Sequence, residues 1–95
     1  MSDYGLRLTP EAMTIFTKLH PEIKKLIKSA LKAVVASPYS GKELHSDLAG
    51  FRSFRTKRYR IIYRINDKER FIDVIHIGHR RSVYAQLRTL VQDTH

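Results

Sequence analysis

Basic side chains dominate the middle of this sequence. Between positions 52 and 64 lie six cations and no acidic residue, namely Arg52, Arg55, Lys57, Arg58, Arg60 and Arg64. The planar guanidinium group of arginine can donate two parallel hydrogen bonds to a phosphate group, so this stretch suits binding of an anion with several oxygens. Like charges packed so closely repel one another, which indicates an anionic partner.

A second group of reactive side chains lies in the segment from His79 to Tyr84, which also holds Arg80 and Arg81. His79 is a candidate acid or base beside the two arginines, or a turn residue. Tyr84 is followed by Leu87 at helical spacing, which also fits a place in the core.

The charge is distributed unevenly along the 95 residues. The chain has 18 Lys and Arg against 9 Asp and Glu, a net charge of +9; residues 1–50 contribute +2 and residues 51–95 contribute +7. A lopsided basic domain suggests nucleic acid or an acidic protein as partner. Solubility alone would favour dispersed charge of both signs.

Several kinds of site are excluded or disfavoured by composition. Without cysteine there is no disulfide, thiolate metal site or cysteine nucleophile. His20, His45 and His95 are too scattered to indicate a metal site, and His76 lies in an apolar run typical of a core histidine. We therefore expect no metal and no cofactor.

Length and hydropathy predict one small domain over residues 1–95, with 42% hydrophobic residues available for a core. The first four residues lack the pattern of a signal peptide, and no apolar run is long enough to span a bilayer. We therefore expect a cytoplasmic protein that does not bind membranes.

The basic stretch is predicted to form two strands of a meander. Apolar and aromatic residues alternate with Arg60, Ile62 and Arg64 between positions 59 and 65, a period of two that is typical of a strand with two different faces. A tight turn is expected at 56–58. The nearly continuous apolar run from Phe71 to Ile77 predicts a central third strand, buried on both faces and ended by Gly78.

Two helices are predicted before this meander. Thr9 and Pro10 begin the first, and His20-Pro21 separates it from the second. The second carries the apolar stripe Ile23, Leu26, Ile27, Ala30, Leu31 and Val34. A weakly alternating strand at 4–8 precedes them, and Leu44 and Leu48 of the connector are expected in the core. Apolar residues at helical spacing predict a short C-terminal helix, namely Val83, Leu87, Leu90 and Val91. The predicted fold is α+β: an N-terminal strand and a helical hairpin packed on a four-stranded, mainly antiparallel sheet, with a short C-terminal helix.

This order of elements resembles the RelE/ParE superfamily of type II toxins. The residues that carry the resemblance are Leu48-Ala49-Gly50, Tyr59-Arg60-Ile61-Ile62-Tyr63-Arg64 and Ile77-Gly78-His79-Arg80-Arg81-Ser82-Val83-Tyr84. The resemblance covers nearly the whole chain and implies two activities on one fold. RelE-like members cut mRNA in the ribosomal A site, whereas ParE-like members poison DNA gyrase without a nuclease site, and an antitoxin holds both inactive. Fold alone does not choose between them.

The RelE-like resemblance implies metal-free cleavage in which the 2′-hydroxyl of the substrate is the nucleophile. In this sequence it assigns phosphate binding to Arg60 and Arg80, activation of the hydroxyl to Arg55, and stacking on or orientation of a base to Tyr84. Because arginine stays protonated, Lys57 or His79 is the alternative proton acceptor. Further candidate RNA-binding residues are Arg52, Arg58, Arg64 and Arg81. For Arg60 and Arg64, a merely exposed strand face is the competing interpretation.

We therefore expect the toxin of a type II toxin–antitoxin module that acts as a ribosome-dependent mRNA endoribonuclease, with ribosome, mRNA and a cognate antitoxin as partners. The alternative is a ParE-like inhibitor of DNA gyrase. A third class is a basic module that only binds nucleic acid.

Overall fold

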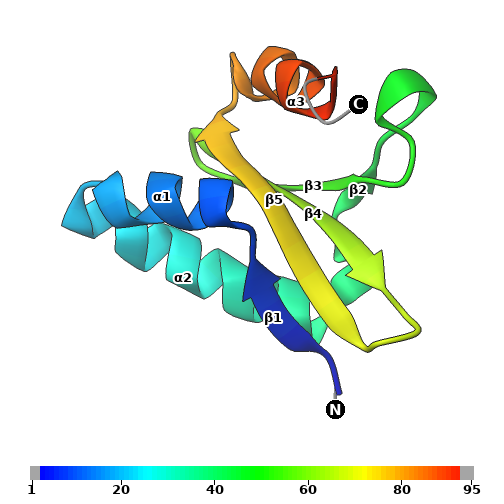
Figure 1. Ribbon diagram of the computed structural model, residues 1–95. Helices are drawn as coiled ribbons and strands as arrows, with labels where there is room; N and C mark the ends of the chain where they lie inside the picture. Colours follow the sequence, from blue (N-terminus) through cyan, green and yellow to red (C-terminus); the bar gives the residue numbers. More distant parts are fainter. Residues whose placement is uncertain (1–2, 93–95) are drawn as a thin grey trace.

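The computed structural model describes residues 3–92, so the predictions that involve residues 1, 2 and 95 lie outside the described part of the chain. The elements in order are β1 (Gly5–Leu8), α1 (Pro10–Lys18), α2 (Pro21–Ala36), η1 (Pro38–Ser40), β2 (Lys42–Glu43), η2 (Ser46–Leu48), β3 (Arg52–Thr56), β4 (Tyr59–Asn66), β5 (Phe71–His79) and α3 (Val83–Gln92). Figure 1 shows α1 and α2 against the sheet, with α3 at the opposite end of β5 from the N-terminus. The α+β class is confirmed.

The sheet has five strands in the order β1-β5-β4-β3-β2, where four were predicted. The additional strand is the two-residue β2, whose Lys42 and Glu43 pair with Ser53 and Arg52 of β3. Two residues are too few to produce a readable alternation, so the sequence pattern did not reveal this strand. Strand β1 runs parallel to β5 and the other pairs are antiparallel, in line with a mainly antiparallel sheet.

Gly78 does not end its strand as predicted, because β5 continues to His79. Gly78 pairs with Arg60 of β4, and a Cβ atom at this position would lie 2.9 Å from Gln86 Oε1 and 3.1 Å from Val83 Cγ2 of α3. The glycine is therefore required for the close approach of α3 to the sheet. That approach places the first turn of α3 beside the basic strands.

Helices α1 and α2 begin where the sequence indicates. The Thr9 hydroxyl accepts a hydrogen bond from the amide of Ala12 at 3.1 Å, and Nδ1 of His20 accepts one from the amide of Glu22 at 3.3 Å. Both caps satisfy amides that the first helical turn leaves unpaired. The core on this side of the sheet consists of Ala12, Ile27, Ala30, Leu31, Val34, Ile61, Tyr63, Ile72, Val74 and Ile77.

A β-bulge in β5 sets which side chains face which helices. Ile62 pairs with His76 and Tyr63 with Val74, so Ile75 is an extra residue on β5. Val74 and Ile77 consequently both face α1 and α2, although an odd number of positions separates them. The burial of β5 on both faces is confirmed, because Ile75 packs in the second core.

The second core lies between the sheet and α3 and consists of Leu44, Leu48, Ile62, Ile75, Val83 and Leu87. It confirms the expected burial of the two connector leucines. His76 is buried on this side as expected, with Nε2 3.0 Å from Gln86 Oε1, although its Nδ1 has no hydrogen-bond partner among the described residues. Within residues 3–92 no helix has the length and apolarity needed to cross a bilayer.

Candidate active site beside α3

The register of the β3–β4 hairpin gathers polar residues on the face that α3 covers. Ser53 pairs with Ile62, and Arg55 pairs with Arg60. Ile62 packs in the α3 core, and alternate residues of a strand share a face, so Ser53, Arg55 and Arg60 lie on the α3 side as well. Two arginines directly opposite one another on a sheet face repel each other. An anion between them would remove that repulsion.

Arg60, Ser53 and Tyr84 form a connected group at the centre of this face. Arg60 Nη1 donates to Ser53 Oγ at 3.4 Å, and the Tyr84 hydroxyl donates to the same oxygen at 3.1 Å. The Arg60 guanidinium carbon lies 5.9 Å from the centroid of the Tyr84 ring, within range of a cation–π contact. Ser53 is only 2% exposed, so it lies beneath the other two side chains.

Tyr84 packs against the α3 core and also borders a pocket, so its position is compatible with both interpretations that the sequence left open. It is half-buried against the α3 core, yet it also lines a shallow pocket together with Lys42 and His45 of the connector. A neighbouring pocket is lined by Lys42, Ser53, Arg55 and Arg60. Lys42 contributes to both pockets, so cationic and aromatic groups lie side by side on this face, with the acidic Glu43 in the pocket that Tyr84 borders. Such a surface suits a phosphate group followed by a nucleobase.

A second cationic group lies at the end of β5, around a pocket lined by Arg58, His79, Arg80 and Arg81. The amide of Arg80 donates to the carbonyl oxygen of Arg58 at 2.7 Å, which ties this segment to the β3–β4 turn. The amide of Arg81 donates to His79 Nδ1 at 3.3 Å. Because Nδ1 accepts this bond, the neutral ring of His79 carries its proton on Nε2 and can donate it to a ligand.

The two groups are neighbours in space. Arg58 and Arg60 are two residues apart around the start of β4, which corresponds to about 7 Å along a strand. Arg60 pairs with Gly78, two residues before Arg80. We call these residues the arginine surface: Arg55, Arg58, Arg60, Arg80 and Arg81. The ion pairs found within residues 3–92 involve Arg7, Arg70 and Arg88, and none includes a member of the arginine surface.

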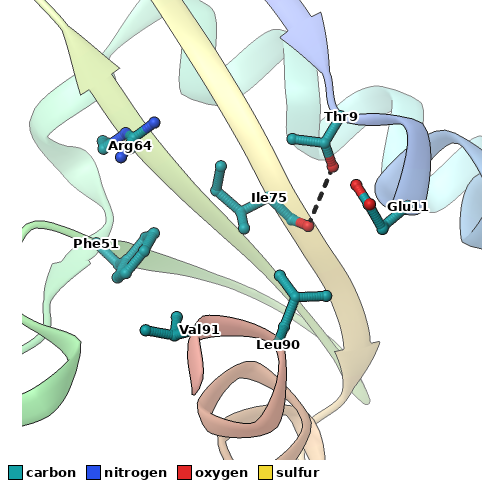
Figure 2. Close-up of a pocket in the computed structure, with 7 residues that line it drawn as sticks. All are labelled: Thr9, Glu11, Phe51, Arg64, Ile75, Leu90 and Val91. Carbon is teal, nitrogen blue, oxygen red and sulfur yellow. Dashed lines mark hydrogen bonds between the residues drawn. The ribbon is translucent and has the colours of Figure 1, made fainter. Parts of the chain in front are cut away.

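Two of the sequence-predicted RNA-binding residues lie elsewhere. Arg52 faces the opposite side of the sheet, where its Nη1 donates to the carbonyl oxygen of Gly41 at 2.7 Å and its guanidinium lies 5.0 Å from the ring of Tyr39. Arg64 lies on the α3 side but four residues along β4 from Arg60, roughly 13 Å away. Figure 2 shows Arg64 in a different pocket, across from Glu11. Lys57 is exposed in the β3–β4 turn.

Sequence reasoning missed two residues of the site. Ser53 is a small polar residue in a strand of aromatic and basic residues, two positions before Arg55, and this spacing was a readable sign of a shared face. Lys42 lies in the two-residue strand β2, which is too short for its sequence pattern to indicate an orientation. The segment is placed by the buried Tyr63 hydroxyl, which donates to the Pro38 carbonyl oxygen at 2.6 Å and accepts from the Gly41 amide at 3.0 Å. Burial also raises the pKa of this phenol.

Comparison with known proteins assigns the family. The model of the "ParE toxin of type II toxin-antitoxin system, parDE" family matches residues 6–84. The chain belongs to the RelE/ParE family of type II toxins. It is 32% identical over 85 residues to toxin RelG of Mycobacterium tuberculosis, which covers 87% of this chain and 98% of that toxin.

Solved structures of the family share the fold. The toxin–antitoxin complex RelBE2 from Mycobacterium tuberculosis contains a chain that superposes with a TM-score of 0.74 at 33% identity, covering 81% of this toxin and 98% of that chain. The E. coli toxin RelE, solved as a mutant in the free state, superposes with a TM-score of 0.77 at 19% identity over 97% of this toxin and 98% of that chain. The family and the fold predicted from the sequence are thus confirmed.

Proposed function

We propose that this toxin is a ribosome-dependent mRNA endoribonuclease in which the 2′-hydroxyl of the substrate attacks the adjacent phosphorus. The observation that carries the proposal is the meeting of Arg60 and Tyr84 on one face, with Arg55 opposite Arg60 and the rest of the arginine surface alongside. In-line attack needs a phosphate group and a neighbouring nucleobase that are both held in place. The arginines can bind the phosphate, and the Tyr84 ring can stack on the nucleobase.

The arginines act on the charge that develops at phosphorus. As the 2′-oxygen bonds to phosphorus, the non-bridging oxygens gain negative charge, and the bond to the 5′-oxygen of the next nucleotide breaks. Guanidinium groups fixed before the reaction stabilise that charge without reorganising. Arg60 and Arg80 fill this role, and Arg55 adds positive charge but remains protonated and accepts no proton.

Tyr84 acts through its ring in this proposal. Its hydroxyl already donates to Ser53, and its half-exposed ring faces the pocket, which suits stacking on a base. Lys57 stays the candidate acceptor of the 2′-hydroxyl proton, and His79, whose Nε2 carries a proton when Nδ1 accepts from Arg81, stays the candidate donor to the departing 5′-oxygen. Because neither is held against the Arg60–Tyr84 pair by a described contact, alignment of the substrate by the ribosome supplies much of the catalysis.

An antitoxin is the proposed protein partner. The related toxin chains come from toxin–antitoxin complexes of Mycobacterium tuberculosis and E. coli. The arginine surface has no acidic partner within the described chain, so an acidic segment of an antitoxin would complement it and block access to RNA.

The test is cleavage of mRNA on programmed ribosomes by the purified toxin. We expect cuts in ribosome-bound mRNA, little cutting of the same RNA when free, and loss of both upon addition of antitoxin. Activity that is equal on free RNA would contradict the requirement for the ribosome.

Inhibition of DNA gyrase is the second candidate function, because the matching family model is that of the ParE toxin. Here the arginine surface would contact the protein target instead of RNA. Intact ribosome-bound mRNA together with blocked gyrase supercoiling would replace the nuclease proposal with this one.

A further inference from the structure

We infer that Ser53 is a positioning residue of the proposed nuclease site, which holds the phenol of Tyr84 and the guanidinium of Arg60 in one arrangement. Ser53 itself is 2% exposed and does not reach a substrate. Its effect on cleavage rests on the proposed function, whereas its effect on the geometry of Tyr84 does not.

The oxygen of Ser53 is the shared acceptor of the site. It receives the Tyr84 hydroxyl at 3.1 Å and Arg60 Nη1 at 3.4 Å. A hydroxyl oxygen has two lone pairs, so it can accept both bonds at once. The Arg60 guanidinium can only donate hydrogen bonds, so it needs an acceptor. A serine at position 53 supplies one, whereas an apolar residue there would not.

The three residues come from three different elements, and this makes the serine a cross-link between layers. Ser53 lies on β3, Arg60 on β4 and Tyr84 in the first turn of α3. Arginine has many rotamers and tyrosine can turn about two bonds, so without a common partner each side chain would sample other positions. Reaction rates fall steeply when reacting groups are misplaced by about 1 Å.

The surroundings of Ser53 show that its hydroxyl is a specific feature of this face. Its cross-strand partner is Ile62, and the nearby core of the α3 side is formed by aliphatic residues. Serine favours strands less than β-branched residues do, so packing alone would favour valine or isoleucine here. The hydroxyl instead supplies the hydrogen bonds described above.

The first arm of the test is a double-mutant cycle in single-turnover cleavage on programmed ribosomes. We expect Ser53→Ala to lower the cleavage rate about tenfold, the scale of one lost hydrogen bond, with little change in the ribosome concentration that gives half-maximal rate. Combined with Tyr84→Phe, the loss should be smaller than the product of the two single losses, because both changes break the same bond. Multiplicative losses, or a Ser53→Ala rate equal to that of the wild type, would overturn the inference.

Two further variants separate the hydrogen bonds from packing. Ser53→Cys keeps the volume but accepts hydrogen bonds weakly, so it should lose activity as Ser53→Ala does. Thr9→Ala removes the cap of α1, away from the site, and serves as a destabilised control that keeps the wild-type rate. Full activity of Ser53→Cys would show that shape alone matters and would overturn the role of the hydroxyl.

The second arm does not depend on cleavage. In protein labelled with 3-fluorotyrosine, the ¹⁹F resonance of Tyr84 is the one that disappears in Tyr84→Phe. Ser53→Ala should shift or split this resonance and leave that of the distant Tyr4 in place; an unchanged Tyr84 resonance would overturn the inference. If the wild type leaves ribosome-bound mRNA intact, the proposed function fails, and this resonance alone decides whether Ser53 positions Tyr84.

Discussion

The arginines at the two ends of the sheet differ in whether they pair with carboxylates. At the β4–β5 hairpin, Arg7 Nε donates to Asp73 at 2.7 Å and its Nη2 donates to Glu69 at 3.2 Å, while its guanidinium lies 4.0 Å from the ring of Phe71. Arg70 likewise pairs with Asp3 at 3.4 Å. At the β3–β4 turn and the end of β5, the arginine surface has no such ion pair among the described residues.

The hairpin end is also held together by a shared carboxylate. Asp67 accepts hydrogen bonds from the hydroxyls of Tyr4 and Tyr39, the latter at 2.7 Å. These bonds, that from Tyr4 first, hold the pKa of Asp67 below its usual value. The contacts join the start of the chain, the connector and the hairpin, so charge at this end serves the fold.

The contrast indicates which end is available to a partner. The charge of each paired arginine is already balanced by a carboxylate of the same chain, whereas the unpaired arginines repel each other until an anion binds. Four experiments test this division, and they are ordered from the largest expected effect to the smallest.

Removing one arginine from each end should have very different effects on activity. Arg80→Ala should slow cleavage of ribosome-bound mRNA by at least about 100-fold, the scale for loss of one electrostatic stabiliser. Arg80→Lys should recover only part, because a point charge does not bind two oxygens in parallel. Arg70→Ala is the matched control and should cleave at a rate near that of the wild type; equal losses at the two ends would contradict the division.

Salt dependence should follow the arginine surface alone. The logarithm of the binding constant for the ribosome or RNA should fall linearly with the logarithm of the salt concentration. Arg58→Ala should reduce the size of this slope by about 0.7, the value for one contact to a single-stranded phosphate. The slope for Arg7→Ala should equal that of the wild type. Binding titrations at several salt concentrations measure both slopes, and a slope that changes equally in the two variants would argue against a localised binding surface.

Stability should depend on the hairpin end and not on the arginine surface, which is the reverse of the expectation for activity. Arg7→Ala leaves Asp73 and Glu69 without their shared cation, so it should lower the midpoint of urea unfolding. Arg80→Ala removes repulsion and no described side-chain hydrogen bond, so its free energy of unfolding should stay within about 0.5 kcal/mol of the wild type or rise. A clear loss of stability in Arg80→Ala would show that the arginine surface is part of the structural framework.

Asp67→Asn should show the smallest effect, confined to the pH dependence of stability. Because the pKa of Asp67 is lower in the folded state than in the unfolded state, its contribution is fully present above about pH 4 and is lost as pH falls through the folded value. The difference in urea midpoint between wild type and Asp67→Asn should therefore shrink below pH 4. Glu22→Gln on α2 is the control, and a difference that persists unchanged at low pH would exclude the charge of Asp67 as its cause.

Much of the fold was readable because its signals are local. The apolar stripe of α2, the cap at Thr9, the break at His20-Pro21 and the alternation in β4 each depend on spacing within one segment, and each element appears where the spacing places it. The concentration of arginine between positions 52 and 64 was equally visible. The sequence by itself therefore determined the class of the fold, the family resemblance and the basic half of the chain.

Which arginines lie close together was decided only by the tertiary structure. The register of β3 against β4 sends Arg52 to the α1–α2 side and Arg55 to the α3 side, and Gly78 lets α3 bring Tyr84 against Arg60 and Ser53. Register, the bulge at Ile75 and helix docking depend on contacts between segments far apart in the chain. Periodicity within one strand shows that it has two faces; only packing against its neighbours determines what each face meets.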